Sequence, residues 1–317
     1  MKKLYAIGID IGGTNTVFGI VDTHGKVVSK SSVQTNQYPT PELIIDDIKK
    51  KLDPLIEDVG GISNIKGIGI GAPNGNHYTG NIEYAPNLQW KGVVPLSKLM
   101  SDKFGIPAVI TNDANAAAIG EMIYGAARGM KNFIMITLGT GVGSGIVIDG
   151  KLVYGHDGFA GELGHVCSVR DGRSCGCGRL GCLEAYASAN GVARTAKEIL
   201  ENQTVDSLLR NIPTESITSK DVFDAASKGD AVALEIFEFT GKILGEAIAD
   251  FVAFSAPEAI ILFGGLTKSG DYIMKPIVNH MEKNLLKIWQ GKIKVLFSDL
   301  NEADAAVLGA SALVWEL

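Results

Sequence analysis

The sequence predicts an α/β fold made of two related lobes. Apolar segments with the length of strands alternate along the chain with segments of helical periodicity, a pattern typical of sheets covered by helices. A strand–glycine turn–strand pattern at residues 4–22 also returns at residues 134–149. Self-similarity at this spacing indicates a repeated structural unit. A coincidence between two glycine-rich hairpins is the alternative interpretation.

The expected elements follow in chain order. The first hairpin turns at Gly12-Gly13-Thr14-Asn15, and the second turns at Gly139-Thr140-Gly141-Val142-Gly143. Because each turn joins strand to strand, neither fits a P-loop or a dinucleotide fingerprint, which lead into a helix. Further strands are expected at 65–71, 108–111, 259–263 and 293–297, and helices at 42–59, 97–104, 114–127, most of 187–253, and 303–317.

Charge and apolar patterning exclude several classes of protein. The net charge of −6, without a basic cluster, is unfavourable for binding nucleic acid or an anionic membrane. No apolar run approaches the roughly 18 residues of a membrane-spanning helix, and no apolar stretch typical of a signal peptide precedes Gly8. We therefore expect a cytoplasmic protein without nucleic-acid or membrane partners.

The cysteines indicate a metal site. All four lie between residues 167 and 182, whereas a disulfide framework would spread its bridges over a small secreted fold. His165, Cys175, Cys177 and Cys182 supply three thiolates and an imidazole, a set that suits one structural zinc ion with four protein ligands. Cys167 shares the face of an expected strand with His165, so either residue could be the fourth ligand.

The glycine turns are candidates for phosphate binding. Their backbone N–H groups can surround a phosphate, because a Cβ at these positions would block the approach. Thr14, Asn15 and Thr140 add polar side chains to the turns, and Gly264-Gly265 follows a third buried strand.

Two aspartates lie at strand ends. Asp10 closes the first strand, where it could hold Mg²⁺ through water or cap the turn. Asp113 follows the strand 108–111 and opens a helix, where the helix dipole favours its ionised form. It could be the base for a hydroxyl nucleophile or simply a helix cap.

Five motifs occur together in an order typical of one family. They are Asp10-Ile-Gly-Gly-Thr-Asn15, Asn112-Asp113-Ala-Asn-Ala-Ala, Leu138-Gly-Thr-Gly-Val-Gly143, Gly161-Glu-Leu-Gly-His165 and Cys175-Gly-Cys-Gly-Arg-Leu-Gly-Cys-Leu-Glu184. Over essentially the whole chain they resemble the ROK family of sugar kinases and repressors, particularly its bacterial glucokinases. The resemblance implies a two-lobed, actin-like or hexokinase-type (ribonuclease H-like) α/β fold with a central cleft for ATP and sugar. The expected lobes are residues 1–111 plus 303–317, and residues 112–302.

The resemblance also implies roles for individual residues. Asp113 is the implied catalytic base, and Mg²⁺ accompanies ATP. The implied sugar ligands are Asn87, Asn112, Asp113, Glu162, His165 and Glu184. The expected nucleotide and Mg²⁺ contacts are Asp10, Gly12, Gly13, Thr14, Asn15, Gly139, Thr140, Gly141, Gly264 and Gly265. The favoured zinc ligands are His165, Cys175, Cys177 and Cys182, which leaves Cys167 as a small buried residue.

The implied activity is phosphorylation of glucose by ATP to glucose 6-phosphate, in a homodimer or homotetramer. Within the family, the alternatives are kinases of fructose, N-acetylmannosamine or N-acetylglucosamine, and polyphosphate as the donor. The segment 72–77 replaces a Pro-Gly-Pro type loop of many members, which leaves the preferred hexose open. An alternative of another class is a sugar-sensing repressor, which in this family carries an added N-terminal DNA-binding domain. We expect no room for such a domain, because the first lobe is expected to begin at about Leu4.

Overall fold

The structure is a computed structural model that describes residues 4–301 and 304–316. Contacts group the chain into two compact units. Unit 1 comprises Met1–Met130, Gly145–Gly161 and Ser298–Leu317, and unit 2 comprises Lys131–Ser144 and Glu162–Phe297. The predicted closing helix includes Ala303 and Leu317, which lie outside the described residues.

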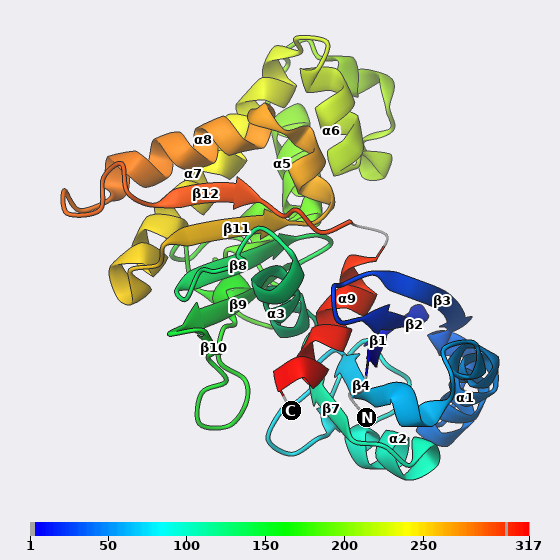
Figure 1. Cartoon of the computed structure of the whole chain (residues 1–317). Helices are drawn as coiled ribbons and strands as arrows, with labels where there is room; N and C mark the ends of the chain where they lie inside the picture. Colours follow the sequence, from blue (N-terminus) through cyan, green and yellow to red (C-terminus); the bar gives the residue numbers. More distant parts are fainter. Residues whose placement is uncertain (1–3, 302–303, 317) are drawn as a thin grey trace. The chain divides into compact units, whose positions relative to one another are not determined.

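Strands and helices alternate as predicted (Figure 1). The strands are β1 Tyr5–Ile11, β2 Asn15–Asp22, β3 Val27–Gln34, β4 Ile65–Gly71, β5 Ile82–Glu83, β6 Val93–Val94, β7 Ala108–Thr111, β8 Phe133–Leu138, β9 Val142–Ile148, β10 Lys151–Leu152, β11 Ala259–Phe263 and β12 Lys294–Phe297. The α-helices are α1 Pro41–Asp58, α2 Leu96–Phe104, α3 Asp113–Tyr124, α4 Glu184–Ala187, α5 Ala189–Asn202, α6 Ser219–Ala226, α7 Ala231–Ser255, α8 Asp271–Asn284 and α9 Ala305–Ala312.

Two five-stranded sheets have the same internal order. The first is β3-β2-β1-β4-β7 and the second is β10-β9-β8-β11-β12. In the first, β1 pairs antiparallel with β2 and parallel with β4, and in the second β8 pairs parallel with β11. Each sheet therefore begins with a glycine-turned hairpin and continues into parallel strands, which confirms the predicted repeat and the α/β class.

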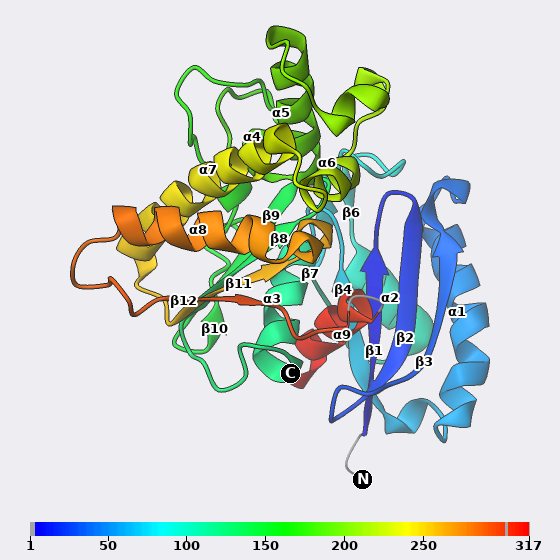
Figure 2. The same ribbon diagram turned by 90° about the horizontal axis from the view of Figure 1, so that it is seen from above.

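The sheet of unit 1 is covered by helices on both faces (Figure 2). Along β1, Ile7, Ile9 and Ile11 point to one face, where they join a buried core with residues of α1 and α2. Gly8 points to the opposite face, where α9 packs so closely that a Cβ on Gly8 would lie 2.1 Å from the carbonyl oxygen of Val307. Asp10 shares that second face, because side chains alternate along a strand.

Unit 2 has a fully buried pair of central strands. Residues 133–136 of β8 and 259–262 of β11 are at most 1% exposed, as expected for parallel strands covered on both sides. Helices α7 and α8 lie in close contact, since a Cβ on Gly241 would come within 2.3 Å of the Cβ of Pro276. This scaffold carries the glycine turn between β8 and β9.

Several elements differ from the prediction. The helix expected to reach Ala127 ends at Tyr124, because the Glu121 carboxylate accepts a hydrogen bond from the backbone N–H of Ala126 at 2.8 Å. The closing helix divides into α9 and a 3-10 helix at Leu313–Glu316. Strand β3 adds an edge to the first sheet that the sequence analysis did not assign.

The contact-based units also differ from the expected lobes. Helix α3 packs against α9, where a Cβ on Gly120 would lie 2.9 Å from the Cα of Gly309. Residues 112–130 therefore group with unit 1, although the sequence analysis assigned them to the second lobe. The lobe boundaries given there stay a prediction. Within the described part of the chain, no helix combines the length and the apolar character needed to cross a membrane.

Candidate active site and metal centre

Three parallel strands of unit 1 end at one edge of the sheet. Asp10 on β1 is in register with Gly71 on β4, and Gly71 is in register with Thr111 on β7. Asn112 and Asp113 follow Thr111 directly. The carboxyl ends of parallel strands are where α/β proteins bind ligands, so this edge brings two aspartates to a place suited to chemistry.

Asn112, and not Asp113, caps helix α3. The Asn112 Oδ1 atom accepts a hydrogen bond of 2.7 Å from the backbone N–H of Asn115, which is the usual N-cap geometry. Asp113 is the first residue of the helix, and its exposed side chain accepts a bond of 2.9 Å from the N–H of Ala114. The alternative interpretation of Asp113 as the helix cap is therefore wrong.

Asp10 and Asp113 lie close to each other across Gly71. A Cβ on Gly71 would lie 3.2 Å from Asp10 Oδ1 and 3.7 Å from the Cα atom of Asp113. Burial, and then the negative charge of Asp113, raises the pKa of Asp10 from 3.8 to about 7. The two carboxylates create a local negative potential, which a divalent cation such as Mg²⁺ would relieve.

The raised pKa of Asp10 predicts a pH-dependent cost to stability. Between pH 4 and pH 7 the unfolded chain ionises Asp10 while the folded chain keeps it protonated, so folding loses stability as the pH rises. Asp10→Asn removes this cost. As the pH rises from 5 to 8, we expect the free energy of unfolding of the variant to increase relative to that of the wild type by about 2 kcal/mol.

Urea unfolding at the two pH values in magnesium-free buffer measures this gain. The prediction is wrong if the free energies of unfolding of the wild type and of Asp10→Asn change by the same amount between pH 5 and pH 8.

The first glycine turn lies against Asn87. A Cβ on Gly13 would lie 2.7 Å from the carbonyl oxygen of Asn87, so the chain can approach only because residue 13 is glycine. The turn is closed by a hydrogen bond of 2.9 Å from the N–H of Gly12 to the carbonyl of Asn15. Thr14, Asn15 and Asn87 are exposed. The structure thus brings a predicted phosphate turn next to a predicted sugar ligand.

The second glycine turn contacts Glu184. The carboxylate oxygen Oε2 of Glu184 accepts a hydrogen bond of 3.0 Å from the backbone N–H of Val142. A Cβ on Gly141 would lie 2.4 Å from the same oxygen. Glycine at position 141 therefore makes room for a carboxylate from a distant part of the chain, a requirement that the sequence analysis did not foresee.

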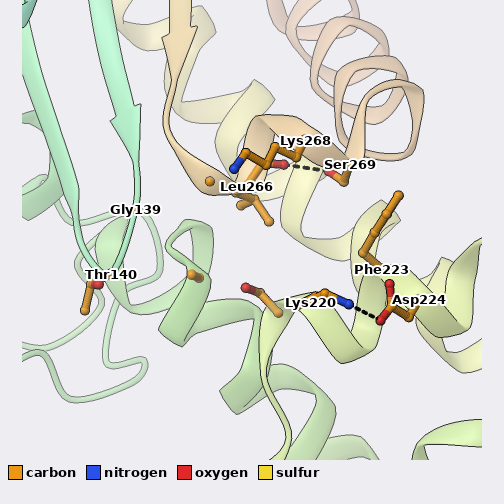
Figure 3. A pocket seen from close by; sticks show the side chains of 11 residues that line it. Gly139, Thr140, Lys220, Phe223, Asp224, Leu266, Lys268 and Ser269 are labelled. Carbon is orange, nitrogen blue, oxygen red and sulfur yellow. Dashed lines mark hydrogen bonds and ion pairs between the residues drawn. The ribbon is translucent and has the colours of Figure 1, made fainter. Parts of the chain in front are cut away.

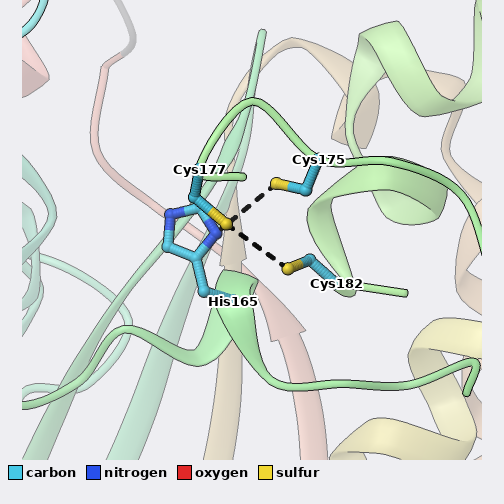
Figure 4. A group of neighbouring side chains, drawn as sticks. All are labelled: His165, Cys175, Cys177 and Cys182. Atoms are coloured by element: carbon cyan, nitrogen blue, oxygen red, sulfur yellow. Dashed lines mark hydrogen bonds between the residues drawn. The ribbon is translucent and has the colours of Figure 1, made fainter. Parts of the chain in front are cut away.

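Four predicted metal ligands converge in unit 2 (Figure 4). One ligand atom from each of His165, Cys175, Cys177 and Cys182 lies within 4.8 Å of all the others. His165 Nδ1 is 3.7 Å from Cys175 Sγ, and the Sγ atoms of Cys177 and Cys182 are 3.6 Å apart. Tetrahedral zinc with Zn–S bonds of about 2.3 Å places sulfur ligands about 3.8 Å apart. The donor set and its spacing fit zinc.

The thiols also show why a cation is needed. Burial, and then the hydrogen bonds that the Cys182 thiol donates to Cys177 and Cys175, raise the pKa of Cys182 to about 12. Such a thiol becomes a thiolate ligand at neutral pH only when a bound cation offsets the cost of its charge.

Cys167 lies outside this cluster. His165 closes a 3-10 helix, Leu163–His165, so the two residues do not share a strand face as expected. Cys167 is exposed, so the prediction that it is a small buried residue is wrong. Glu162 directly precedes this short helix and is exposed. Its backbone carbonyl oxygen accepts a hydrogen bond of 3.0 Å from the N–H of His165.

A pocket of about 560 Å³ lies beside the second glycine turn (Figure 3). It brings Gly139 and Thr140 together with Gly265, as predicted, while Gly264 lies directly after β11 and is the N-cap of the 3-10 helix Gly265–Ser269. The sequence analysis missed the rest of the wall, which combines the apolar side chains Phe223 and Leu266 with polar groups. The remaining lining residues are Ala189, Ser219, Lys220, Asp224, Lys268 and Ser269.

A family model described as the ROK family matches residues 6–316. The chain belongs to the ROK family. The matched range includes the two glycine turns, the two aspartates at the sheet edge and the Cys₃His cluster.

Several curated relatives at 34–38% identity are bacterial glucokinases. The chain is 38% identical to a glucokinase of Halalkalibacterium halodurans over 99% of this chain and 96% of the relative. It is 37% identical to a glucokinase of Streptomyces coelicolor over 98% of this chain and 97% of the relative. Among solved structures, a ROK glucokinase from Streptomyces griseus in complex with glucose and AMPPNP has a TM-score of 0.79 and 36% identity, covering 99% and 100% of the two chains.

Proposed function

We propose that this ROK protein is a glucokinase, which transfers the γ-phosphoryl group of ATP to glucose and forms glucose 6-phosphate. The observation that carries this proposal is the full-length similarity to the glucokinase that binds glucose and an ATP analogue. Similarity at 34–38% identity to several curated glucokinases supports it. The carboxylates at the sheet edge supply groups that such a reaction needs.

In this proposal Asp113 is the catalytic base. It accepts a hydrogen bond from the attacking sugar hydroxyl, orients its oxygen, and takes the proton as the new P–O bond forms. Its exposed carboxylate is available for this task because Asn112 already caps α3. Asn112 keeps its side-chain N–H₂ group for the sugar, since only its Oδ1 atom serves the cap. The exposed Asn87 is a further proposed sugar ligand.

The nucleotide contacts are divided between glycine turns and a pocket. Backbone N–H groups at Gly12, Gly13 and Thr14, and at Gly139–Gly141, bind phosphate oxygens. Adenosine occupies the 560 Å³ pocket, where Phe223 and Leu266 offer apolar contact to the base and Gly264-Gly265 lets the chain approach it. Asp10 holds Mg²⁺ through water. Asn15 and Thr140 are polar neighbours of the phosphates. Bound Mg²⁺ neutralises charge on the transferred phosphoryl group.

Zinc has a structural role in this proposal. His165, Cys175, Cys177 and Cys182 hold one ion per chain, and four protein ligands leave no open position for chemistry. His165 presents Nδ1 to the cluster, so its Nε2 atom binds the sugar, together with Glu162 and Glu184. A homodimer or homotetramer and a cytoplasmic location stay predictions that follow from the resemblance and the sequence.

Substrate preference is the direct test of this function. We expect kcat/KM for glucose to exceed that for fructose, N-acetylmannosamine and N-acetylglucosamine by roughly tenfold or more, because a site built to hydrogen-bond the hydroxyls of one sugar discriminates against an analogue that does not match them. A coupled assay with ATP across these sugars measures it, and polyphosphate in place of ATP tests the donor. Faster phosphorylation of another hexose or aminosugar would replace glucose as the substrate and leave the family unchanged.

A further inference from the structure

The side chain of Arg173 lies almost fully inside unit 2, with only 9% of its surface exposed. Its Nε atom donates to Glu198 Oε2 at 3.0 Å, Nη1 donates to the carbonyl oxygen of Ala185 at 3.1 Å, and Nη2 donates to Thr195 Oγ1 at 3.0 Å. The guanidinium carbon lies 4.6 Å from the centre of the Tyr186 ring, within cation–π distance. A planar five-donor group satisfies these partners at once.

The backbone of Arg173 contacts the same segment. Its N–H donates to Tyr186 Oη at 2.7 Å, and its carbonyl oxygen accepts the N–H of Gly181 at 2.8 Å. Gly181 directly precedes Cys182, and Ala185 directly follows Glu184. Arg173 therefore holds the chain on both sides of the Glu184 carboxylate.

The position of Glu184 matters because its side chain lies between the second glycine turn and a proposed zinc ligand. Oε2 accepts the N–H of Val142 beside the glycine turn, and Oε1 lies 3.6 Å from Cys175 Sγ. A ligand carboxylate loses affinity when it moves by a fraction of an ångström. Groups that orient a ligand-binding residue without touching the ligand often change affinity or activity by 10- to 100-fold.

Arg194 provides a matched comparison on the same network. It donates to the other oxygen of Glu198 at 2.9 Å and to the carbonyl oxygen of Ser174 at 3.1 Å. Burial would raise the pKa of Glu198, but hydrogen bonds from Arg173 and then Arg194 outweigh burial and lower it. The Arg194 side chain is 41% exposed, and no contact that the structure describes joins it to Gly181, Ala185 or Tyr186.

We propose that Arg173 is a positioning residue for sugar binding, because it fixes the backbone on both sides of Glu184. The proposal rests on the proposed function, since Glu184 is there a sugar ligand. It concerns a residue that lies outside the family motifs quoted above and touches neither sugar nor metal.

Arg173→Lys tests this role while keeping the positive charge. A lysine can pair with Glu198 but lacks the fork that also reaches Ala185 and Thr195. We expect KM for glucose to rise roughly tenfold or more. The value of kcat at saturating glucose should stay within about threefold, because the base is untouched. KM for ATP and the zinc-to-protein ratio should stay close to those of the wild type, whereas the melting temperature should fall by a few degrees because buried hydrogen bonds are lost.

Two further variants separate positioning from general loss of structure. Arg194→Lys should keep KM for glucose within about twofold of the wild-type value, because Arg194 is an exposed partner of the same glutamate. In a Glu184→Gln background, Arg173→Lys should add little, because two changes that act through one group are not additive. Any of three results would overturn the proposal. They are an unchanged KM for glucose in Arg173→Lys, an equal effect of Arg173→Lys in the wild-type and Glu184→Gln backgrounds, and a rise in KM that follows loss of zinc.

The wild-type protein in the same assay tests the proposed function separately. If it forms no glucose 6-phosphate, the proposed function and the role of Arg173 fail together. If it turns over glucose and Arg173→Lys is unaffected, only the role of Arg173 fails.

Discussion

Asp113→Asn is expected to lower kcat by roughly 10² to 10⁴, the range typical of a positioned general base. The amide has nearly the shape of the carboxylate but cannot take the proton of the sugar hydroxyl. KM for glucose should change much less, because neighbouring polar groups still hold the ring. Steady-state kinetics with saturating ATP and Mg²⁺ separates the two parameters.

The structure makes this substitution easy to interpret. The cap of α3 is Asn112, through its bond to Asn115, so the variant should fold and melt like the wild type. A folded Asp113→Asn protein with a kcat close to that of the wild type would remove Asp113 from the mechanism.

Cys175→Ser or Cys177→Ser is expected to release the zinc ion and to raise KM for glucose by roughly 10- to 100-fold. The loss of one thiolate opens the tetrahedron and frees the loop that carries His165 and leads to Glu184. Metal analysis should find about one zinc per wild-type chain, as a four-ligand site requires, and much less in the variants.

Cys167→Ser is the matched control for these variants. It removes a thiol from the same loop, but Cys167 is exposed and lies outside the cluster. Its zinc content and KM should equal those of the wild type. Full activity of a zinc-free wild-type preparation would refute the structural role of the metal.

Apolar strands were predictable almost to the residue. The ranges of β4, β7 and β11 agree with the sequence analysis, because a run of buried apolar side chains between turn residues is a strong local signal. Strand β3 has no such signal. It is an edge strand with Lys30 and several serines, and only Val33 among its eight residues is buried.

The candidate site was predictable where chemistry lies in short motifs. The metal cluster required only the spacing of histidine and cysteines, and the structure confirms that these ligands converge. The partners of Glu184 were not predictable in this way. Val142 precedes it by 42 residues, and the pocket residue Phe223 lies almost as far from the nearest quoted motif. Such contacts depend on how helices pack, which leaves no pattern in the neighbouring sequence.

The packing of α9 on β1 has a consequence for synthesis of the chain on the ribosome. Gly8 is synthesised long before Val307, which covers it in the folded unit. Until then the nascent sheet of unit 1 exposes one face, the face that also carries Asp10. Contacts so distant in sequence form slowly, because the intervening loop must close first. The binding edge of unit 1 therefore forms late in folding, and its uncovered sheet face is prone to aggregation until α9 packs on it.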